Sequence, residues 1–92
     1  MPKLRTTIAD TRKAFQQEIR VKRAYYNIMQ QDIADTLGIA QSRVSTLMAN
    51  PDQLSVGRLR EIITMLKLDP IVVLSFLGYS QKEIKRINSH QA

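Results

Sequence analysis

One glycine between two short runs of regularly spaced apolar residues constrains this chain more than any other feature. In "IADTLGIAQSRVSTL", residues 33–47, Gly38 separates Ile33 and Leu37 from Val44 and Leu47. Steps of three and four residues are typical of amphipathic helices. Glycine adopts a positive φ without steric cost, so Gly38 suits a tight turn. Two helices joined by a short turn can cross closely when a residue at the contact is small, as Ala34 is. The sequence therefore predicts helices over 30–37 and from 40 or 41 to 49.

The segment before this pair predicts a long first helix over residues 7–26. Thr7 can cap its start, and Asn27, which tolerates the left-handed conformation, can end it. One apolar stripe is expected to face inward, formed by Ile8, Phe15, Ile19 and Tyr26.

Basic residues concentrate in the same N-terminal segment. Residues 1–26 contain seven Lys or Arg against Asp10 and Glu18, and the whole chain has a formal net charge of +6. This uneven charge favours a polyanionic partner. Arg12, Lys13 and Arg20 are expected to form a solvated face of the first helix.

Three start signals predict further helices after the loop at Asn50-Pro51-Asp52. Ser55 can cap a fourth helix with an apolar stripe formed by Val56, Leu59, Ile62, Ile63 and Leu66. Asp69-Pro70 combines a cap with a proline at the first helical position. The helix that follows, "IVVLSFL", is apolar nearly all round, so burial on more than one side is expected. Gly78 can end this helix, and Ser80 with Glu83 forms a capping box for a sixth.

These signals predict an all-α fold of five or six helices in a single domain. Its expected parts are a basic arm (1–6), a basic first helix (7–26), the helix pair (30–49) and C-terminal helices (55–88). A frayed tail is expected from Ser89 to Ala92. No repeat or linker divides the chain.

Several function classes lack their usual signals. The chain has no cysteine, and no apolar run approaches the roughly 18 residues of a membrane span. No glycine-rich phosphate loop or nucleophile motif occurs, and His90 has no evident metal-binding neighbours. We therefore expect a cytoplasmic protein that is not an enzyme and has no catalytic residue, metal, cofactor or small-molecule ligand.

On the helix after Gly38, five residues are left facing outward: Gln41, Ser42, Arg43, Ser45 and Thr46. The surrounding stretch "MQQDIADTLGIAQSRVSTL" resembles the helix-turn-helix of the Cro/phage-repressor (XRE-type) family of DNA-binding proteins. The resemblance covers roughly residues 19–74. It also includes Ile19-Arg20 and Arg23 in the first helix, and "LSVGRLREIITMLKLDP" further on. It implies a lambda-repressor-like DNA-binding domain.

The resemblance also implies roles for individual residues. In similar proteins the helix after the turn enters the major groove and reads base edges with its N-terminal residues. Gln41, Ser42 and Thr46 would then read bases, and Arg43 would contact the backbone or a guanine. Ser45 shares this face. Gln30 would donate to a phosphate at the positive end of its helix.

Two positions depart from the family pattern. Many relatives have a glutamate where Met48 stands, paired with the arginine at the position of Arg23, which here is free to contact phosphate or packs differently. The loop after the reading helix often carries Gly and Lys in relatives, whereas here it reads "NPDQ", with Asp52 and no cation.

Two functions therefore compete. The first is a sequence-specific, repressor-like transcriptional regulator that binds double-stranded DNA as a homodimer. The second is a protein-interaction module of the same fold, such as an antitoxin or an inhibitor of a host factor. A dimer surface is expected from apolar residues left uncovered on the last two helices: Ile71, Val72, Phe76, Tyr79, Ile84 and Ile87.

Overall fold

The computed structural model describes residues 8–90, with the backbone alone for residues 8, 9, 81 and 87–90. The basic arm, the Thr7 cap and the side chains of Ile8 and Ile87 lie outside this description. Over the described residues the chain forms six α-helices, one 3-10 turn and no strand, so the prediction of an all-α fold is confirmed. The elements are α1 (Ile8–Tyr26), α2 (Gln30–Leu37), α3 (Gln41–Ala49), η1 (Pro51–Gln53), α4 (Val56–Leu66), α5 (Pro70–Phe76) and α6 (Gln81–His90).

The helix ends follow the local signals closely. Asn27 and Gly38 end α1 and α2 in the left-handed conformation, with φ of 56° and 70°. Ser55 accepts a hydrogen bond from the backbone N–H of Arg58, and Asp69 accepts one from that of Ile71. Short-range chemistry therefore decides where the helices begin and end. Ser89 and His90, which were expected in a frayed tail, belong to α6, and residues 91–92 lie outside the described residues.

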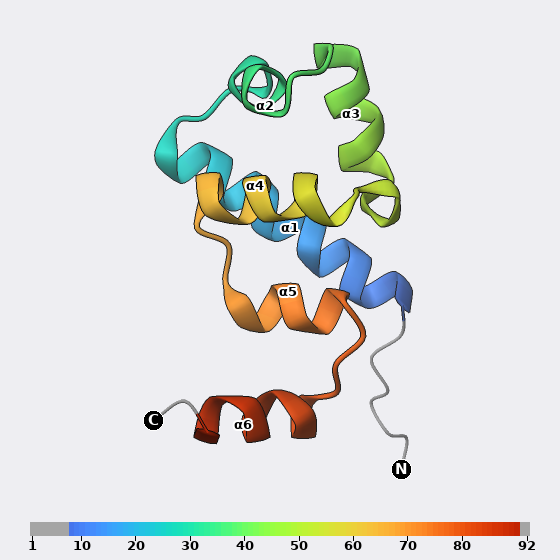
Figure 1. Cartoon of the computed structure of the whole chain (residues 1–92), viewed down its shortest axis with the longest axis vertical. Coiled ribbons are helices and arrows are strands. Elements are labelled where there is room, and N and C mark those ends of the chain that lie inside the picture. Colours follow the sequence, from blue (N-terminus) through green and yellow to red (C-terminus); the bar gives the residue numbers. More distant parts are fainter. Residues whose placement is uncertain (1–7, 91–92) are drawn as a thin grey trace.

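The helices are arranged around α1, the longest of them. Both α4 and α5 pack against it, and α2 packs against α3 and α4. Figure 1 shows the α2–α3 pair at one end of the long axis of the molecule and α6 at the opposite end, beside α5. The fold therefore separates the α2–α3 pair from the C-terminal helices.

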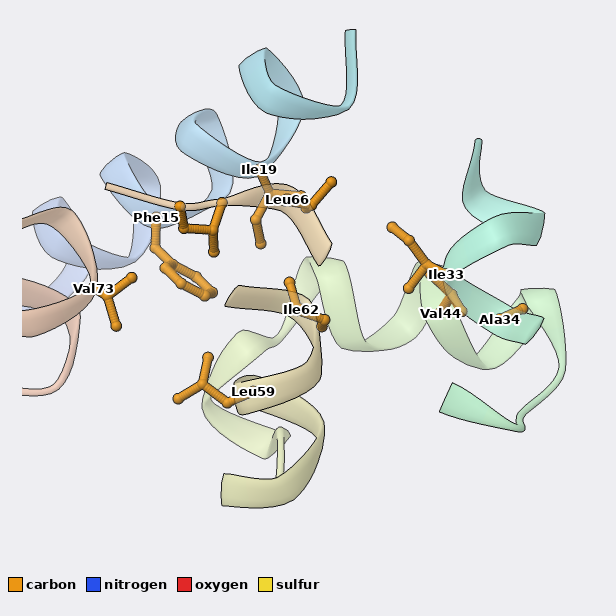
Figure 2. Packing of buried hydrophobic residues seen from close by; sticks show 10 residues of the cluster. Phe15, Ile19, Ile33, Ala34, Val44, Leu59, Ile62, Leu66 and Val73 are labelled. Carbon is orange, nitrogen blue, oxygen red and sulfur yellow. The ribbon is translucent and has the colours of Figure 1, made fainter. Parts of the chain in front are cut away.

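The core joins these elements through apolar side chains (Figure 2). Phe15 is fully buried and stacks on Phe76 of α5, with ring centroids 4.3 Å apart. Around it lie Ile19 of α1 and the buried face of α4. The same continuous cluster extends to α2 and α3 through Ile33 and Val44. Ten buried residues form this cluster: Phe15, Ile19, Ile33, Ala34, Val44, Leu59, Ile62, Leu66, Leu68 and Val73.

Two expectations about apolar faces are wrong. Tyr26 was expected on the inner stripe of α1 but is exposed, in edge-to-face contact with Tyr25. Val56 was expected on the inner stripe of α4 but is 71% exposed at the first position of that helix. The expected burial of α5 on more than one side agrees with its packing against both α1 and α6, although Ile71 remains 44% exposed.

A polar connection fastens α1 to the link between α4 and α5. Glu18 accepts hydrogen bonds from the Lys22 ammonium (2.7 Å) and from the backbone N–H of Asp69 (2.8 Å). Lys22 also donates to the carbonyl of Lys67 (3.0 Å), where φ is 52°. The hydrogen bond from Lys22, supported by that from Asp69, lowers the pKa of Glu18 below its ordinary value of 4.5.

This connection predicts a pH-dependent stability. Because the pKa of Glu18 is lower in the folded than in the unfolded chain, its contribution is complete above pH 4.5 and is lost as the pH falls through the folded pKa. Glu18→Gln should therefore lower the free energy of unfolding by about 1 kcal/mol at pH 7. The difference from wild type should shrink as the pH falls below 4.5 and through the folded pKa. Urea unfolding of both proteins across this range measures it, and a pH-independent difference would contradict the assignment.

Candidate functional site

The turn between α2 and α3 is built by Gly38, Ile39 and Ala40. Gly38 has φ 70° and ψ 35°, and its N–H donates to the carbonyl of Ala34. The N–H of Ile39 donates to the same carbonyl (3.0 Å), so the chain turns within one residue of the end of α2. Ala40 is extended and leads directly into α3. Four fully buried side chains then hold the two helices together: Ile33, Ala34, Val44 and Leu47.

This packing leaves one polar face of α3 exposed. All five residues expected to face outward do so: Gln41, Ser42, Arg43, Ser45 and Thr46. Within residues 8–90, the side chains of Gln41, Ser42 and Arg43 make no hydrogen bond or ion pair. These three occupy the first turn of α3, so the unpartnered groups gather at its N-terminal end. Thr46 instead donates to the carbonyl of Ser42 in its own helix (3.2 Å).

Gln30 and Ser45 hydrogen-bond to each other. The Gln30 amide donates to the Ser45 hydroxyl (3.1 Å), and that hydroxyl is also within 3.3 Å of the Gln30 carbonyl oxygen. The sequence had suggested two separate outward contacts for these residues. The close crossing of α2 and α3 brings them together, so each is already partnered. Because an amide nitrogen carries two N–H groups, a contact from Gln30 to phosphate would use the second of them and leave the bond to Ser45 in place.

A cleft of about 330 Å³ lies beside this pair, between α1, α2 and α3. Arg20 and Arg23 line it from α1, and Gln30 lines it from α2. Met48 contributes an apolar wall, at the position where relatives of the resembled family have a glutamate. Seven residues line the cleft: Gln16, Ile19, Arg20, Arg23, Gln30, Met48 and Ala49.

Arg23 is held by the backbone. Its Nε donates to the carbonyl of Ile28 (3.2 Å), directly before α2. Arg23 makes no ion pair within the part of the chain that the structure describes. Arg23 therefore packs against the α1–α2 connection through its Nε, while its charge has no carboxylate partner among the described residues.

Two further residues of α1 secure the end of α3, and neither was expected from the sequence. Gln16 donates to the carbonyls of Met48 (3.0 Å) and Ala49 (3.1 Å), the last two residues of α3. Arg12 donates to both carboxylate oxygens of Asp52 in η1 (3.2 and 2.6 Å). Arg12 was expected on a solvated face, and its side chain is partly exposed, but it is also paired with Asp52. The spacing of four residues places Arg12 and Gln16 on one face of α1, but the sequence does not show which element that face contacts.

The Arg12–Asp52 pair also changes the electrostatics of the turn after α3. The hydrogen bond from Arg12 lowers the pKa of Asp52 and raises that of Arg12. Both side chains remain partly exposed, at 37% for Arg12 and 49% for Asp52. The expected loop at Asn50-Pro51-Asp52 is in fact a 3-10 turn anchored by the buried Pro51.

The proposed dimer surface is only partly exposed. Ile71 and Tyr79 are 44% and 45% exposed, and Leu77, which was not among the expected residues, is exposed as well. Val72 and Phe76 pack against the core instead. Ile84 is only 2% exposed, so the expectation that it is left uncovered is wrong. It is buried because α6 packs back on α5.

Comparison with protein-family models, with curated proteins and with solved structures finds no match for this chain. Among the described residues, no three His, Cys, Asp or Glu side chains gather as metal ligands do. No helix formed by these residues is both long and apolar enough to cross a membrane.

The turn geometry predicts opposite effects for two glycine substitutions. Gly38→Ala should lower the free energy of unfolding by about 1 kcal/mol, because alanine is strained at positive φ. Gly57→Ala should raise it by about 0.4–1 kcal/mol, because Gly57 lies in α4 with open space around its Cα. Thermal unfolding of both variants measures this. Stabilisation by Gly38→Ala would contradict the left-handed turn.

Proposed function

We propose that this protein is a sequence-specific, repressor-like transcriptional regulator that binds double-stranded DNA as a homodimer. The observation that carries the proposal is the exposed N-terminal turn of α3. There the side chains of Gln41, Ser42 and Arg43 have no partner among residues 8–90, while the apolar side of the same helix is used in packing. Polar groups that do no structural work at the exposed end of a helix are available to a partner.

The chemistry of these residues suits base edges in the major groove. Glutamine can pair with adenine through its amide, arginine pairs with guanine, and serine accepts or donates to several bases. Gln41, Arg43 and Ser42 respectively supply these groups. Thr46 lies one turn further along and can contribute its methyl group. Each good pairing contributes about 1–3 kcal/mol of discrimination between bases.

The cleft beside α3 supports phosphate binding close to the helix that we propose reads the bases. Arg20 and Arg23 supply two positive charges on one wall, and Arg23 has no carboxylate to neutralise it within residues 8–90. Backbone contacts of this kind orient a protein on DNA without selecting a sequence. The net charge of +6 acts in the same direction.

The separation of the α2–α3 pair from the C-terminal helices supports binding as a dimer. One helix pair reads only a few base pairs, and a twofold dimer reads two half-sites about one helical turn apart. Exposed apolar residues at the C-terminal end are Ile71, Leu77 and Tyr79. Because α6 lies at the end of the molecule opposite the α2–α3 pair (Figure 1), a contact there leaves α3 uncovered.

A protein-interaction module of the same fold is the second candidate. The exposed apolar side chains of Val21 and Tyr25 on α1 favour it. The two functions differ in their response to salt. Binding to DNA falls steeply between 50 and 200 mM salt through counterion release, by about 10³–10⁵ for six to ten phosphate contacts. An apolar protein contact lacks this dependence.

The DNA-binding proposal is tested by selecting duplexes from a random pool at low salt and then measuring the enriched sequence. Gln41→Ala should weaken binding to that sequence by about 1–3 kcal/mol and relax the preference at one base pair. Gln17→Ala is the matched control, since Gln17 is exposed on α1. Because Gln17 accepts a hydrogen bond from Arg20 (3.1 Å), the control is read in the base preference, which should be unchanged, and not in the affinity. Failure to enrich any sequence would favour the protein-partner function, and an unchanged affinity for Gln41→Ala would remove Gln41 from the reading face.

The dimer is tested by a pair of matched acidic substitutions. Ile71→Glu and Val56→Glu each replace an exposed apolar residue in the first turn of a helix, where an acidic side chain is favoured by the helix dipole. We expect sedimentation to show a dimer for wild type and Val56→Glu, and a monomer for Ile71→Glu. A monomeric wild type at high micromolar concentration would contradict the C-terminal interface.

A further inference from the structure

We propose that Arg12 is a positioning residue that supplies the counter-charge for Asp52, so that the surface formed by α3 and η1 meets DNA without a free carboxylate. The inference rests on the proposed function. It assigns a role to a residue in the first turns of α1, outside the segment in which the sequence resembles a known family.

The geometry of the pair supports this role. Arg12 Nε and Nη2 donate to the two different oxygens of Asp52, at 3.2 and 2.6 Å. Two parallel hydrogen bonds fix the guanidinium and the carboxylate relative to each other more firmly than a single contact does. The pair therefore has a defined position at the end of α3.

The backbone that carries Asp52 is held in place. Asp52 lies in a 3-10 turn in which the preceding Pro51 is buried. The N–H of Gln53 donates to the carbonyl of Asn50 (3.0 Å), which closes the turn. Gln16 holds the last carbonyls of α3 from the same face of α1. The position of Asp52 is thus set by the packing of α1 against α3 and η1.

The charge of Asp52 is unusual for its surroundings. Between Asp35 and Glu61, a stretch that includes α3, η1 and the start of α4, Asp52 is the one acidic residue, against Arg43, Arg58 and Arg60. Its charge would oppose theirs at a surface that binds a polyanion. Arg12 offsets this charge from another part of the chain.

The distances allow Asp52 to influence DNA binding. The nine residues of α3 span only about 14 Å, at about 1.5 Å per residue. A major groove is about 12 Å wide, so phosphates flank both sides of a helix that lies in it. Charges separated by about one Debye length, roughly 8 Å at physiological salt, still interact. An unpaired Asp52 carboxylate would therefore repel nearby phosphates.

A purely structural role would leave a different signature. Partly exposed ion pairs contribute little to folding stability, so a structural pair would change the melting temperature slightly. It would not change how DNA affinity depends on salt. Salt dependence therefore distinguishes the two roles.

The test measures binding of the full chain to a random-sequence duplex at several salt concentrations, for Arg12→Gln, Asp52→Asn and the double variant. Arg12→Gln should weaken binding by about two- to fivefold, because it leaves the Asp52 carboxylate without its positive partner. Asp52→Asn should strengthen binding by a similar factor and steepen the slope of log K against log salt by up to about 0.9, because Arg12 becomes free for one phosphate. The double variant should bind like wild type, since the pair is removed as a unit.

Lys13→Gln is the matched control. It removes the same charge one residue further along α1, from an exposed side chain, and leaves the Arg12–Asp52 pair intact. Its effect should be smaller than that of Arg12→Gln. Melting temperatures of all variants check that each remains folded.

Three results would overturn the inference. The first is unchanged affinity in all variants. The second is a double variant that binds as weakly as Arg12→Gln alone, so that adding Asp52→Asn restores nothing. The third is an equal loss for Lys13→Gln and Arg12→Gln, which would indicate that overall charge alone matters. If wild type itself binds no duplex at low salt, the proposed function fails and this inference fails with it. The wild-type measurement thus separates the two failures.

Discussion

The contact between Phe15 of α1 and the helices that follow is the interaction on which the rest of the structure depends. Phe15 is fully buried and stacks on Phe76, so one side chain joins the first helix to the fifth across most of the chain. A domain of 92 residues has little apolar surface to bury, and α1 supplies the face on which α4 and α5 assemble. The α2–α3 pair is then carried at one end of this assembly.

The polar contacts of α1 follow from the same packing. Once Phe15 and Ile19 face inward, the flanks of α1 face its neighbours on either side. Gln16 on one flank reaches the end of α3, and Glu18 on the other accepts from the link between α4 and α5. One helix thereby positions both the proposed reading helix and the C-terminal half. The cleft with its two arginines also lies along α1, so charge and packing are combined in one element.

Sequence reasoning worked where the cause of a structure is local. Asn27 and Gly38 end helices because their own backbone tolerates a positive φ, and Ser55 and Asp69 begin helices by capping nearby N–H groups. It failed where the outcome depends on a distant partner. Tyr26 lies in register with the apolar stripe of α1, yet it is 38% exposed, with the Lys67 ammonium 5.7 Å from the centre of its ring. Ile84 was expected to be uncovered, yet α6 turns its apolar side onto α5.

The sequence by itself determined an all-helical fold of five or six helices, the tight turn at Gly38 and the outward polar face of α3, because helical periodicity and capping act over a few residues. The tertiary structure alone decided which of those polar residues are free. It pairs Ser45 with Gln30 and leaves Gln41 and Arg43 without partners among residues 8–90. It also brings Arg12 to Asp52, 40 positions away in the chain. Pairings over such separations depend on how helices pack, and no spacing within one helix encodes them.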